Sequence, residues 1–353
     1  MSVLKVDQVS KLYRSTTRGG GLTPALRKVS FELSQGEVIS LIGESGSGKT
    51  TIGKIILRLV RPTAGAVTFD GKDITSYSPR RLRDYYRHVT GVFQDPFSSY
   101  NPVYMADRVF GLVRDVYFAH ISDKDWDAKI EAALDAVALN PADVLGKYPH
   151  QLSGGQQQRL LIARALLLEV KVLVADEIIS MLDASTRVDV LNLLVKLKRS
   201  GLAILFVTHD LSLGNYVSDR TIILRHGAIV EMGATEKVFG NPQHDYTKML
   251  LTAVPELHKK WQHTPIGAVA VSGNGSTAAT ATDVIESAPD GAIAPALSHV
   301  AMLDELSHAE RVIKRDIRSV FTRRAVSKSA VALSLEPPAL TEFEPGHLVA
   351  EPE

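Results

Sequence analysis

Short apolar runs of strand length recur along the first 235 residues, with polar or helix-patterned segments between them. Residues 38–42 and 172–175 are two such runs, and their nearly continuous apolar character is typical of buried parallel strands. Strand and helix patterns alternate over residues 3–105 and again over residues 166–235. This alternation predicts an α/β core.

Residues 106–165 have a helical pattern instead. The apolar residues Ile130, Ala133, Leu134, Val137 and Leu139 follow the spacing of one helix face. We therefore expect a helical subdomain over about residues 106–165, inserted between the two halves of the α/β core.

The chain changes character near its end. Residues 264–300 contain no Lys or Arg and are rich in Ala, Gly, Ser and Thr, which is typical of flexible linkers. Residues 301–326 have a helical and strongly charged pattern, which indicates a solvated helix or, alternatively, a contact with anionic lipid headgroups. The last stretch, over residues 336–349, is acidic and interrupted by proline.

These patterns divide the chain into three parts. We predict a domain over residues 1–257, a flexible linker over 258–300, and a C-terminal extension over 301–353 that carries the charged helix. The linker has too few large apolar side chains to join a core. We therefore expect a chain that is cut after Gln262 to stay folded.

Composition excludes several classes of protein. A formal net charge of +1 over 353 residues argues against the basic surface of nucleic-acid-binding proteins, so no nucleic-acid partner is expected. The chain has no cysteine, which excludes disulfides, thiolate metal sites and cysteine-ligated iron–sulfur clusters. No run approaches the roughly 18 apolar residues of a membrane span, and the chain opens with a strand pattern rather than a signal peptide. We expect a cytosolic protein that reaches a membrane only through partners.

Residues 43–50 match the pattern G-x-x-x-x-G-K-[ST] in full, between a predicted strand and a predicted helix. Backbone N–H groups of such a loop turn toward a polyphosphate, and the following helix adds the positive end of its dipole. Lys49 is predicted to reach the β- and γ-phosphates of ATP, and the Thr50 hydroxyl to ligate Mg²⁺. The nucleotide-binding residues predicted here are Gly43, Glu44, Ser45, Gly46, Ser47, Gly48, Lys49, Thr50 and Thr51.

Two acids, Asp176 and Glu177, follow the second buried strand. This is the carboxyl edge at which α/β folds place their sites. Asp176 is predicted to hold the Mg²⁺ that Thr50 also touches, directly or through water. Glu177 is predicted to polarise a water for attack on the γ-phosphate.

Residues 152–159 read Leu-Ser-Gly-Gly-Gln-Gln-Gln-Arg and precede a helical run. This segment resembles the signature motif of ATP-binding cassette (ABC) proteins, and in physical terms it is a second anion site at a helix N-terminus. The resemblance implies a P-loop NTPase of the ABC ATPase type. It also implies that Ser153, Gly154, Gly155 and Gln156 close over ATP held by the phosphate loop of another subunit.

The same resemblance assigns roles to four further residues. Tyr13 is similar to the aromatic residue that stacks on adenine, and Gln94 to the glutamine that senses Mg²⁺ and the attacking water. Asp183 lies in a segment that resembles the D-loop and is expected to contribute to nucleotide binding. His209, after an apolar strand, resembles the histidine that contacts the γ-phosphate. The predicted catalytic residues are Glu177, His209, Gln94 and Lys49, and the predicted metal ligands are Thr50, Gln94 and Asp176.

A narrower resemblance is to the ATPase subunits of dipeptide, oligopeptide and nickel importers. It covers about residues 3–257 and depends on residues 93–102, 148–151, 180–185 and 241–247. The last of these, within an element over about residues 236–257, reads Asn-Pro-Gln-His-Asp-Tyr-Thr and is close to a His-Pro-Tyr-Thr element of that family.

Two residues depart from this pattern. Ile178 stands where the family usually has proline, directly after Glu177, and Asp245 replaces the proline of the later element. Both acids of the site remain, so we expect Ile178 to slow hydrolysis at most. Replacing Ile178 by proline is expected to hold or raise the ATPase activity.

The resemblance implies an ATP-hydrolysing subunit that powers import of peptides or a related small solute. Its expected partners are two membrane-spanning permease subunits, a second similar ATPase subunit and, indirectly, an extracytoplasmic substrate-binding protein. A heterodimer is favoured over a homodimer, and the expected location is the cytoplasmic face of the cell membrane. Two alternatives stay open: a soluble non-transport ABC ATPase and a catalytically weak regulatory cassette. The sequence does not name the cargo.

Overall fold

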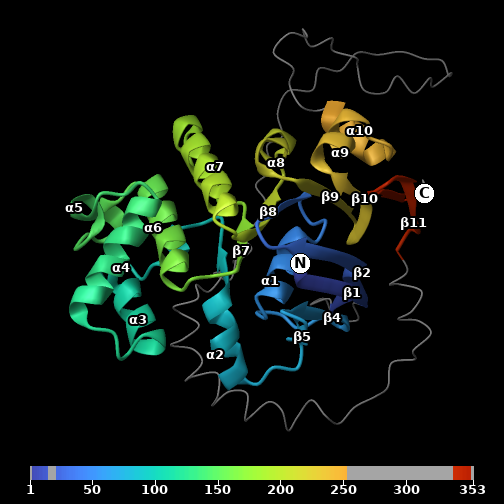
Figure 1. The fold of residues 1–353 in the computed structure, drawn as a ribbon. Helices are drawn as coiled ribbons and strands as arrows, with labels where there is room; N and C mark the ends of the chain where they lie inside the picture. Colours follow the sequence, from blue (N-terminus) through green and yellow to red (C-terminus); the bar gives the residue numbers. More distant parts are fainter. Residues whose placement is uncertain (1, 15–20, 253–336, 351–353) are drawn as a thin grey trace, which may run out of the picture.

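The computed structural model describes residues 2–14, 21–252 and 337–350. At its centre is a mixed sheet (Figure 1). The strands of this sheet, in chain order, are β3 (Val38–Ile42), β6 (Val89–Val92), β7 (Val172–Asp176), β8 (Ala203–Thr208), β9 (Arg220–Arg225), β10 (Ala228–Ala234), β11 (Leu340–Glu344) and β12 (His347–Ala350). Their spatial order is β11-β12-β10-β9-β3-β8-β7-β6. The strands from β9 to β6 run parallel, and β10, β12 and β11 continue the sheet antiparallel.

A smaller antiparallel sheet lies beside the central one. Its strands are β1 (Ser2–Arg14), β2 (Leu22–Ser34), β4 (Ala64–Phe69) and β5 (Lys72–Asp73), in the order β2-β1-β4-β5. Helix α1 (Lys49–Ile56) packs between the two sheets, because Ile52 and Ile55 share one buried apolar cluster with Leu4 of β1 and Leu41 of β3. The phosphate-loop helix is therefore held by both sheets.

Four α-helices lie in the region for which the sequence predicts a helical subdomain, over about residues 106–165. It contains α3 (Arg108–Tyr117), α4 (Asp123–Ala136), α5 (Pro141–Val144) and α6 (Gly154–Leu167), which gather on one side of the molecule in Figure 1. Ala133, Leu134, Val137 and Leu139 are buried in the core that these helices share with β7 and β8, and Ile130 packs against it partly buried.

The remaining helices surround the sheet. They are α2 (Pro79–His88), α7 (Ala184–Arg199), α8 (Leu211–Val217), α9 (Thr235–Gly240) and α10 (Asp245–Thr252). Figure 1 shows α8, α9 and α10 together above the end of the sheet formed by β9 and β10. A third apolar cluster joins them to the sheet, with Leu211, Val238 and Tyr246 packed against Ile223.

The structure corrects the predicted end of the catalytic domain. Residues 340–350 form a hairpin whose strand β12 pairs with β10, with Met232 opposite Leu348 and Glu231 opposite Val349. In this acidic, proline-interrupted stretch, Pro345 and Gly346 form the turn of the hairpin, with Gly346 at φ 74°. The central sheet is thus completed by residues 340–350. The predicted linker over 258–300 and the predicted helix over 301–326 lie outside the described residues.

Candidate functional site

The phosphate loop connects the carboxyl end of β3 to the first turn of α1. Its close packing requires glycine at two places. A Cβ atom on Gly48, which has φ 108°, would lie 2.6 Å from the carbonyl oxygen of Ala25, and one on Gly43 would lie 2.2 Å from that of Leu224. Any other residue would push the loop away from the strands that position it.

Lys49 is the first residue of α1 and is 5% exposed. Its Nζ donates to the carbonyl oxygens of Gly43 and Glu44, at 2.7 and 2.8 Å. Burial lowers the pKa of this ammonium, and the carboxylates of Glu177, Asp176 and Glu44 oppose that shift. The phosphate loop therefore holds the ammonium of Lys49 near the carboxylates of Glu177 and Asp176.

Thr50 and Asp176 come together as the sequence predicts. The Thr50 hydroxyl donates to Oδ1 of Asp176 at 3.4 Å, across from α1 to the end of β7. Asp176 is almost fully buried, and this desolvation raises the pKa of its carboxyl to about 6. The Thr50 hydrogen bond and the ammonium groups of Lys54 and Lys49 pull that pKa down, whereas the neighbouring Glu177 pushes it up.

Glu177 and His209 also lie side by side, at the ends of the neighbouring strands β7 and β8. Oε1 of Glu177 is 3.3 Å from Nδ1 of His209. The Glu177 backbone adopts φ 52°, a left-handed conformation that is uncommon outside glycine. Its N–H donates to the carbonyl of Val207 at 2.9 Å, which fixes the turn that aims its side chain.

The predicted signature residues begin helix α6. Ser153 is its N-cap: the Ser153 hydroxyl accepts from the Gln156 N–H at 3.2 Å, and the Gln156 side chain accepts from the Ser153 N–H at 2.9 Å. Gly154 and Gly155 form the first turn. A Cβ on Gly155 would lie 2.5 Å from Cγ2 of Thr186 on α7, so the two helix starts pack closely.

Asp183 caps α7 in the same way. Its carboxylate accepts from the hydroxyl of Ser185 and from the N–H and hydroxyl of Thr186, at 2.6, 2.9 and 2.8 Å. These bonds hold the pKa of Asp183 well below its usual range, with the Ser185 hydroxyl as the largest cause. Within the described residues, Ser153 and Asp183 thus bond to their own helix starts rather than to the phosphate loop.

Tyr13 and Gln94 lie at the surface. Tyr13 is 40% exposed near the end of β1, with Lys11 Nζ 5.0 Å from its ring centroid. Gln94 is exposed just after β6, the neighbour of the strand that carries Asp176 and Glu177. Their predicted roles stay predictions.

The structure adds one residue that the sequence reasoning did not assign to the site. The backbone N–H of Glu44, in the phosphate loop, donates to the hydroxyl of Tyr246 at 3.1 Å. Tyr246 lies in α10, within the stretch over 241–247 that marked the importer resemblance. The resemblance of residues 241–247 to importers pointed to this segment. Its sequence spacing does not show that Tyr246 contacts Glu44, which lies 202 residues earlier in the chain.

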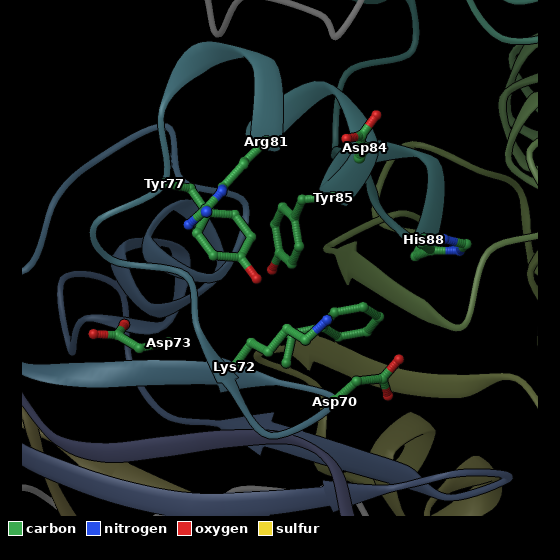
Figure 2. Close-up of a pocket in the computed structure, with 9 residues that line it drawn as sticks. Asp70, Lys72, Asp73, Tyr77, Arg81, Asp84, Tyr85 and His88 are labelled. Atoms are coloured by element: carbon green, nitrogen blue, oxygen red, sulfur yellow. The ribbon is translucent and has the colours of Figure 1, made fainter.

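A cavity of about 700 Å³ lies elsewhere, between the β4–β5 hairpin and α2. Figure 2 shows Asp70 and Lys72 on the hairpin side and Tyr77, Arg81, Asp84, Tyr85 and His88 on the helix side. None of the residues predicted for nucleotide chemistry lines this cavity. Its size therefore does not identify it as the catalytic site, and the phosphate-loop edge of the central sheet is the better candidate.

A phosphate loop, an acidic pair on the adjacent strand and a glycine-opened helix in an inserted helical subdomain define an ABC-type ATPase. Comparisons with known proteins agree with this class. The family model described as "ABC transporter" matches residues 26–180, and the model "Oligopeptide/dipeptide transporter, C-terminal region" matches residues 230–277.

The curated relatives narrow the class of ABC ATPase to ATP-binding proteins of transport systems. A putative peptide import ATP-binding protein of Brucella abortus is 44% identical over 255 residues, which is 72% of this chain and 78% of the relative. The oligopeptide transport ATP-binding protein OppF of Streptococcus mutans is 44% identical over 233 residues, covering 66% of this chain and 75% of that protein. The glutathione import ATP-binding protein GsiA of Escherichia coli is 44% identical as well, although only 37% of its length is covered.

Solved structures support the fold. The dimeric post-hydrolysis state of the ATP-binding cassette MJ0796, bound to ADP and Pi, superposes with a TM-score of 0.59 at 30% identity, covering 66% of this chain and 98% of the other. The chain belongs to the ABC transporter family, in the group of ATP-binding subunits of importers. It is an ATPase of that family.

Proposed function

We propose that this chain powers the import of peptides, by binding and hydrolysing ATP in a dimer of cassettes docked on permease subunits. The observation that carries the proposal is the combination of the Lys49, Asp176 and Glu177 site with the C-terminal element over 230–277. The first part is shared by ABC ATPases, and the second is described as belonging to oligopeptide and dipeptide transporters.

The residues of the phosphate loop fit a nucleoside triphosphate with Mg²⁺. Ser47 Oγ is buried with no hydrogen-bond partner among the described residues, and the Lys49 ammonium is held against the loop carbonyls. We propose that Lys49 transfers its donors from these carbonyls to the β- and γ-phosphates. Thr50 and Asp176, already joined, would hold Mg²⁺, with Gln94 completing its contacts, and the cation supplies charge neutralisation at the phosphates.

Glu177 is proposed to accept a proton from the attacking water. Its contact with Nδ1 of His209 keeps the two side chains at one edge of the sheet, where His209 can also reach the γ-phosphate. Asp176 is proposed as a metal ligand rather than a base, because it lies against the Thr50 hydroxyl, the other proposed ligand. Tyr13 is proposed to stack on adenine.

The second half of the site is proposed to come from another subunit. Ser153, Gly154, Gly155 and Gln156 form a complete helix N-terminus that a phosphate can approach, and Asp183 begins the neighbouring helix. Each nucleotide would then lie between one phosphate loop and the partner's signature helix. We favour a second, similar ATPase chain as this partner.

A surface close to Gln94 is proposed to contact the permease subunits. Val103, Tyr104 and Met105 are 72%, 45% and 45% exposed, an apolar group on the segment that leads from Gln94 into the helical subdomain. None of the helices among the described residues is long and apolar enough to cross a membrane. We place the subunit at the cytoplasmic face of the membrane, attached through its permeases, with a substrate-binding protein acting on the other side.

Reconstitution tests this proposal. The chain, its partner ATPase and the permeases are placed in vesicles, and uptake of labelled di- and oligopeptides is measured with ATP on the subunit's side. We expect ATP-dependent peptide uptake that Glu177→Gln abolishes while leaving ATP binding intact. ATP hydrolysis without uptake of any peptide would overturn the peptide assignment, and failure to associate with permeases would favour a soluble ABC ATPase.

A further inference from the structure

We propose that Tyr246 is a positioning residue for ATP binding, and that the C-terminal hairpin holds Tyr246 in place through the buried carboxylate of Glu231. The first part of the argument is a single peptide unit of the phosphate loop. The carbonyl of Gly43 accepts from Lys49 Nζ at 2.7 Å, and the N–H of Glu44, in the same peptide plane, donates to the Tyr246 hydroxyl at 3.1 Å. The orientation of this plane therefore links Tyr246 to the lysine that is aimed at the phosphates.

The Gly43–Glu44 peptide plane is thus held on one side by the Tyr246 hydroxyl and on the other by the ammonium of Lys49, which is proposed to turn toward the phosphates. When Lys49 leaves the Gly43 carbonyl, the bond to Tyr246 is the remaining hydrogen bond described for this plane, and glycine itself adds no side chain that would limit its rotation. The Tyr246 side chain is 4% exposed, and Cζ of Arg225 lies 5.2 Å from the centroid of its ring. Burial raises the pKa of the Tyr246 phenol. The acceptor is thus a neutral, immobilised hydroxyl, which is suited to hold one backbone N–H in one direction.

Tyr246 is in turn placed by the start of α10. Nδ1 of His244 accepts from the Tyr246 N–H at 3.0 Å, as an N-cap side chain does. The loop before it is held by Glu231, whose carboxylate is fully buried. Oε1 of Glu231 accepts from the Gln243 N–H at 2.9 Å, and Oε2 accepts from the His244 N–H at 3.1 Å.

The hairpin supplies the last member of this arrangement. Nε2 of His347, on β12, lies 2.7 Å from Oε1 of Glu231, and both side chains are 0% exposed. We call Glu231, Gln243, His244 and His347 the Glu231 cluster. Without His347 the carboxylate would be buried with only backbone donors, and the loop that sets Tyr246 would lose its support. The end of the chain thereby contributes to nucleotide binding.

The test is ATP affinity of the isolated full-length chain, which does not depend on peptide transport and so can fail separately from the proposed function. Tyr246→Phe keeps the ring and removes only the acceptor. We expect its Kd for ATP to rise about fivefold to tenfold, since a buried N–H is left without a partner. In the assembled ATPase the KM for ATP should rise likewise, with kcat within about twofold, because Glu177 and His209 are untouched.

A matched control and a direct readout sharpen the comparison. Tyr216→Phe removes a hydroxyl that bonds to Asn192 on the surface, so its Kd should equal that of the unaltered chain. Hydrogen exchange of the peptide containing Glu44 should quicken in Tyr246→Phe and not in Tyr216→Phe. Unchanged Kd and unchanged exchange in Tyr246→Phe would overturn the role of Tyr246.

A double-mutant comparison tests the hairpin. His347→Gln, which keeps an N–H donor, should retain near-normal affinity, whereas His347→Ala should weaken ATP binding by less than Tyr246→Phe does. In the Tyr246→Phe background, His347→Ala should add no further loss of affinity, because it acts through the same hydroxyl. Additive losses, or equal affinity for His347→Ala and the unaltered chain, would show that the hairpin does not reach the phosphate loop.

Discussion

At the scale of single residues, Asp176 is a proposed metal ligand whose burial lowers the stability of the folded chain. It is 5% exposed, and burial raises the pKa of its carboxyl from an ordinary 3.8 to about 6. A carboxyl with a raised folded-state pKa is harder to ionise in the folded chain than in the unfolded one. The folded chain therefore loses stability as the pH rises from about 4 to about 6.

Asp176→Asn removes this titration. In the absence of nucleotide, the stability gained by the variant over the unaltered chain should grow by on the order of 2–3 kcal/mol between pH 4 and pH 8. Urea unfolding at several pH values measures it, with the exposed Asp189→Asn as the control. A stability difference that does not change with pH would contradict the buried, hard-to-ionise carboxylate.

Ile178 shows how a departure from the family pattern is accommodated. Its side chain is 1% exposed and packs in the core shared by β7, α6 and α7. The Glu177 turn next to it keeps its hydrogen bonds to Val207 and Ser180. Isoleucine at this position is therefore buried without disturbing the hydrogen bonds of the Glu177 turn.

Ile178→Pro is expected to hold or raise kcat for ATP, because proline stiffens the link between Glu177 and the D-loop. Its thermal stability should fall, since part of a buried side chain is lost, at a cost of about 1 kcal/mol. Ile178→Val separates burial from stiffness, because it removes one methylene and adds no constraint. A collapse of kcat in the proline variant alone would indicate that this turn needs isoleucine.

At the scale of elements, several residues of the candidate site lie at the starts of helices. At the start of α10, Asp245 occupies the first turn, is exposed and pairs with Lys248 at 3.1 Å. An acid in the first turn is favoured by the helix dipole, much as proline is favoured there by its fixed φ. The loss of the family's proline is therefore compensated locally, and His244 and Tyr246 keep their contacts.

Ser153→Arg tests the second helix start. A cation at the N-terminus of α6 opposes the helix dipole and would obstruct a phosphate brought by the partner subunit. We expect ATP affinity of the isolated chain to stay within about twofold, and ATPase activity of the assembled dimer to fall at least tenfold. Ser122→Arg is the matched control, because Ser122 caps α4 by the same hydrogen bond at 3.1 Å. Weaker ATP binding by the isolated Ser153→Arg chain would indicate a site formed within one subunit.

At the scale of the whole molecule, the end of the chain is part of the catalytic sheet. This changes the expected result of truncation: a chain ending at Gln262 would lose β11 and β12 and leave the edge of β10 unpaired. It would also leave Glu231 buried without His347. Such a chain should be less stable by about 2–4 kcal/mol, whereas composition alone predicted a folded chain with near-normal nucleotide binding.

A second truncation identifies the cause. A chain ending at residue 336 lacks the hairpin but keeps everything before it. If the hairpin is responsible, both truncated chains should lose the same stability in urea unfolding and the same ATP affinity. A loss confined to the shorter chain would assign the effect to residues 263–336 instead.

The sequence by itself determined the α/β class, the phosphate loop, the acidic pair and the helical insertion. Each of these depends on residues that are contiguous or nearly so, where strand and helix periods and glycine positions have one physical meaning. The sequence also predicted that Thr50 and Asp176 lie close together, because parallel strands end at the same edge of a sheet.

Only the tertiary structure decided where the hairpin and Tyr246 belong. A run such as residues 347–350 is compatible with any exposed strand edge, and packing alone selected β10. The pairing of His347 with Glu231 joins residues 116 positions apart, and that of Tyr246 with Glu44 joins residues 202 apart. Such contacts have no local periodicity, because a buried polar group takes its partner from whichever element the fold brings beside it.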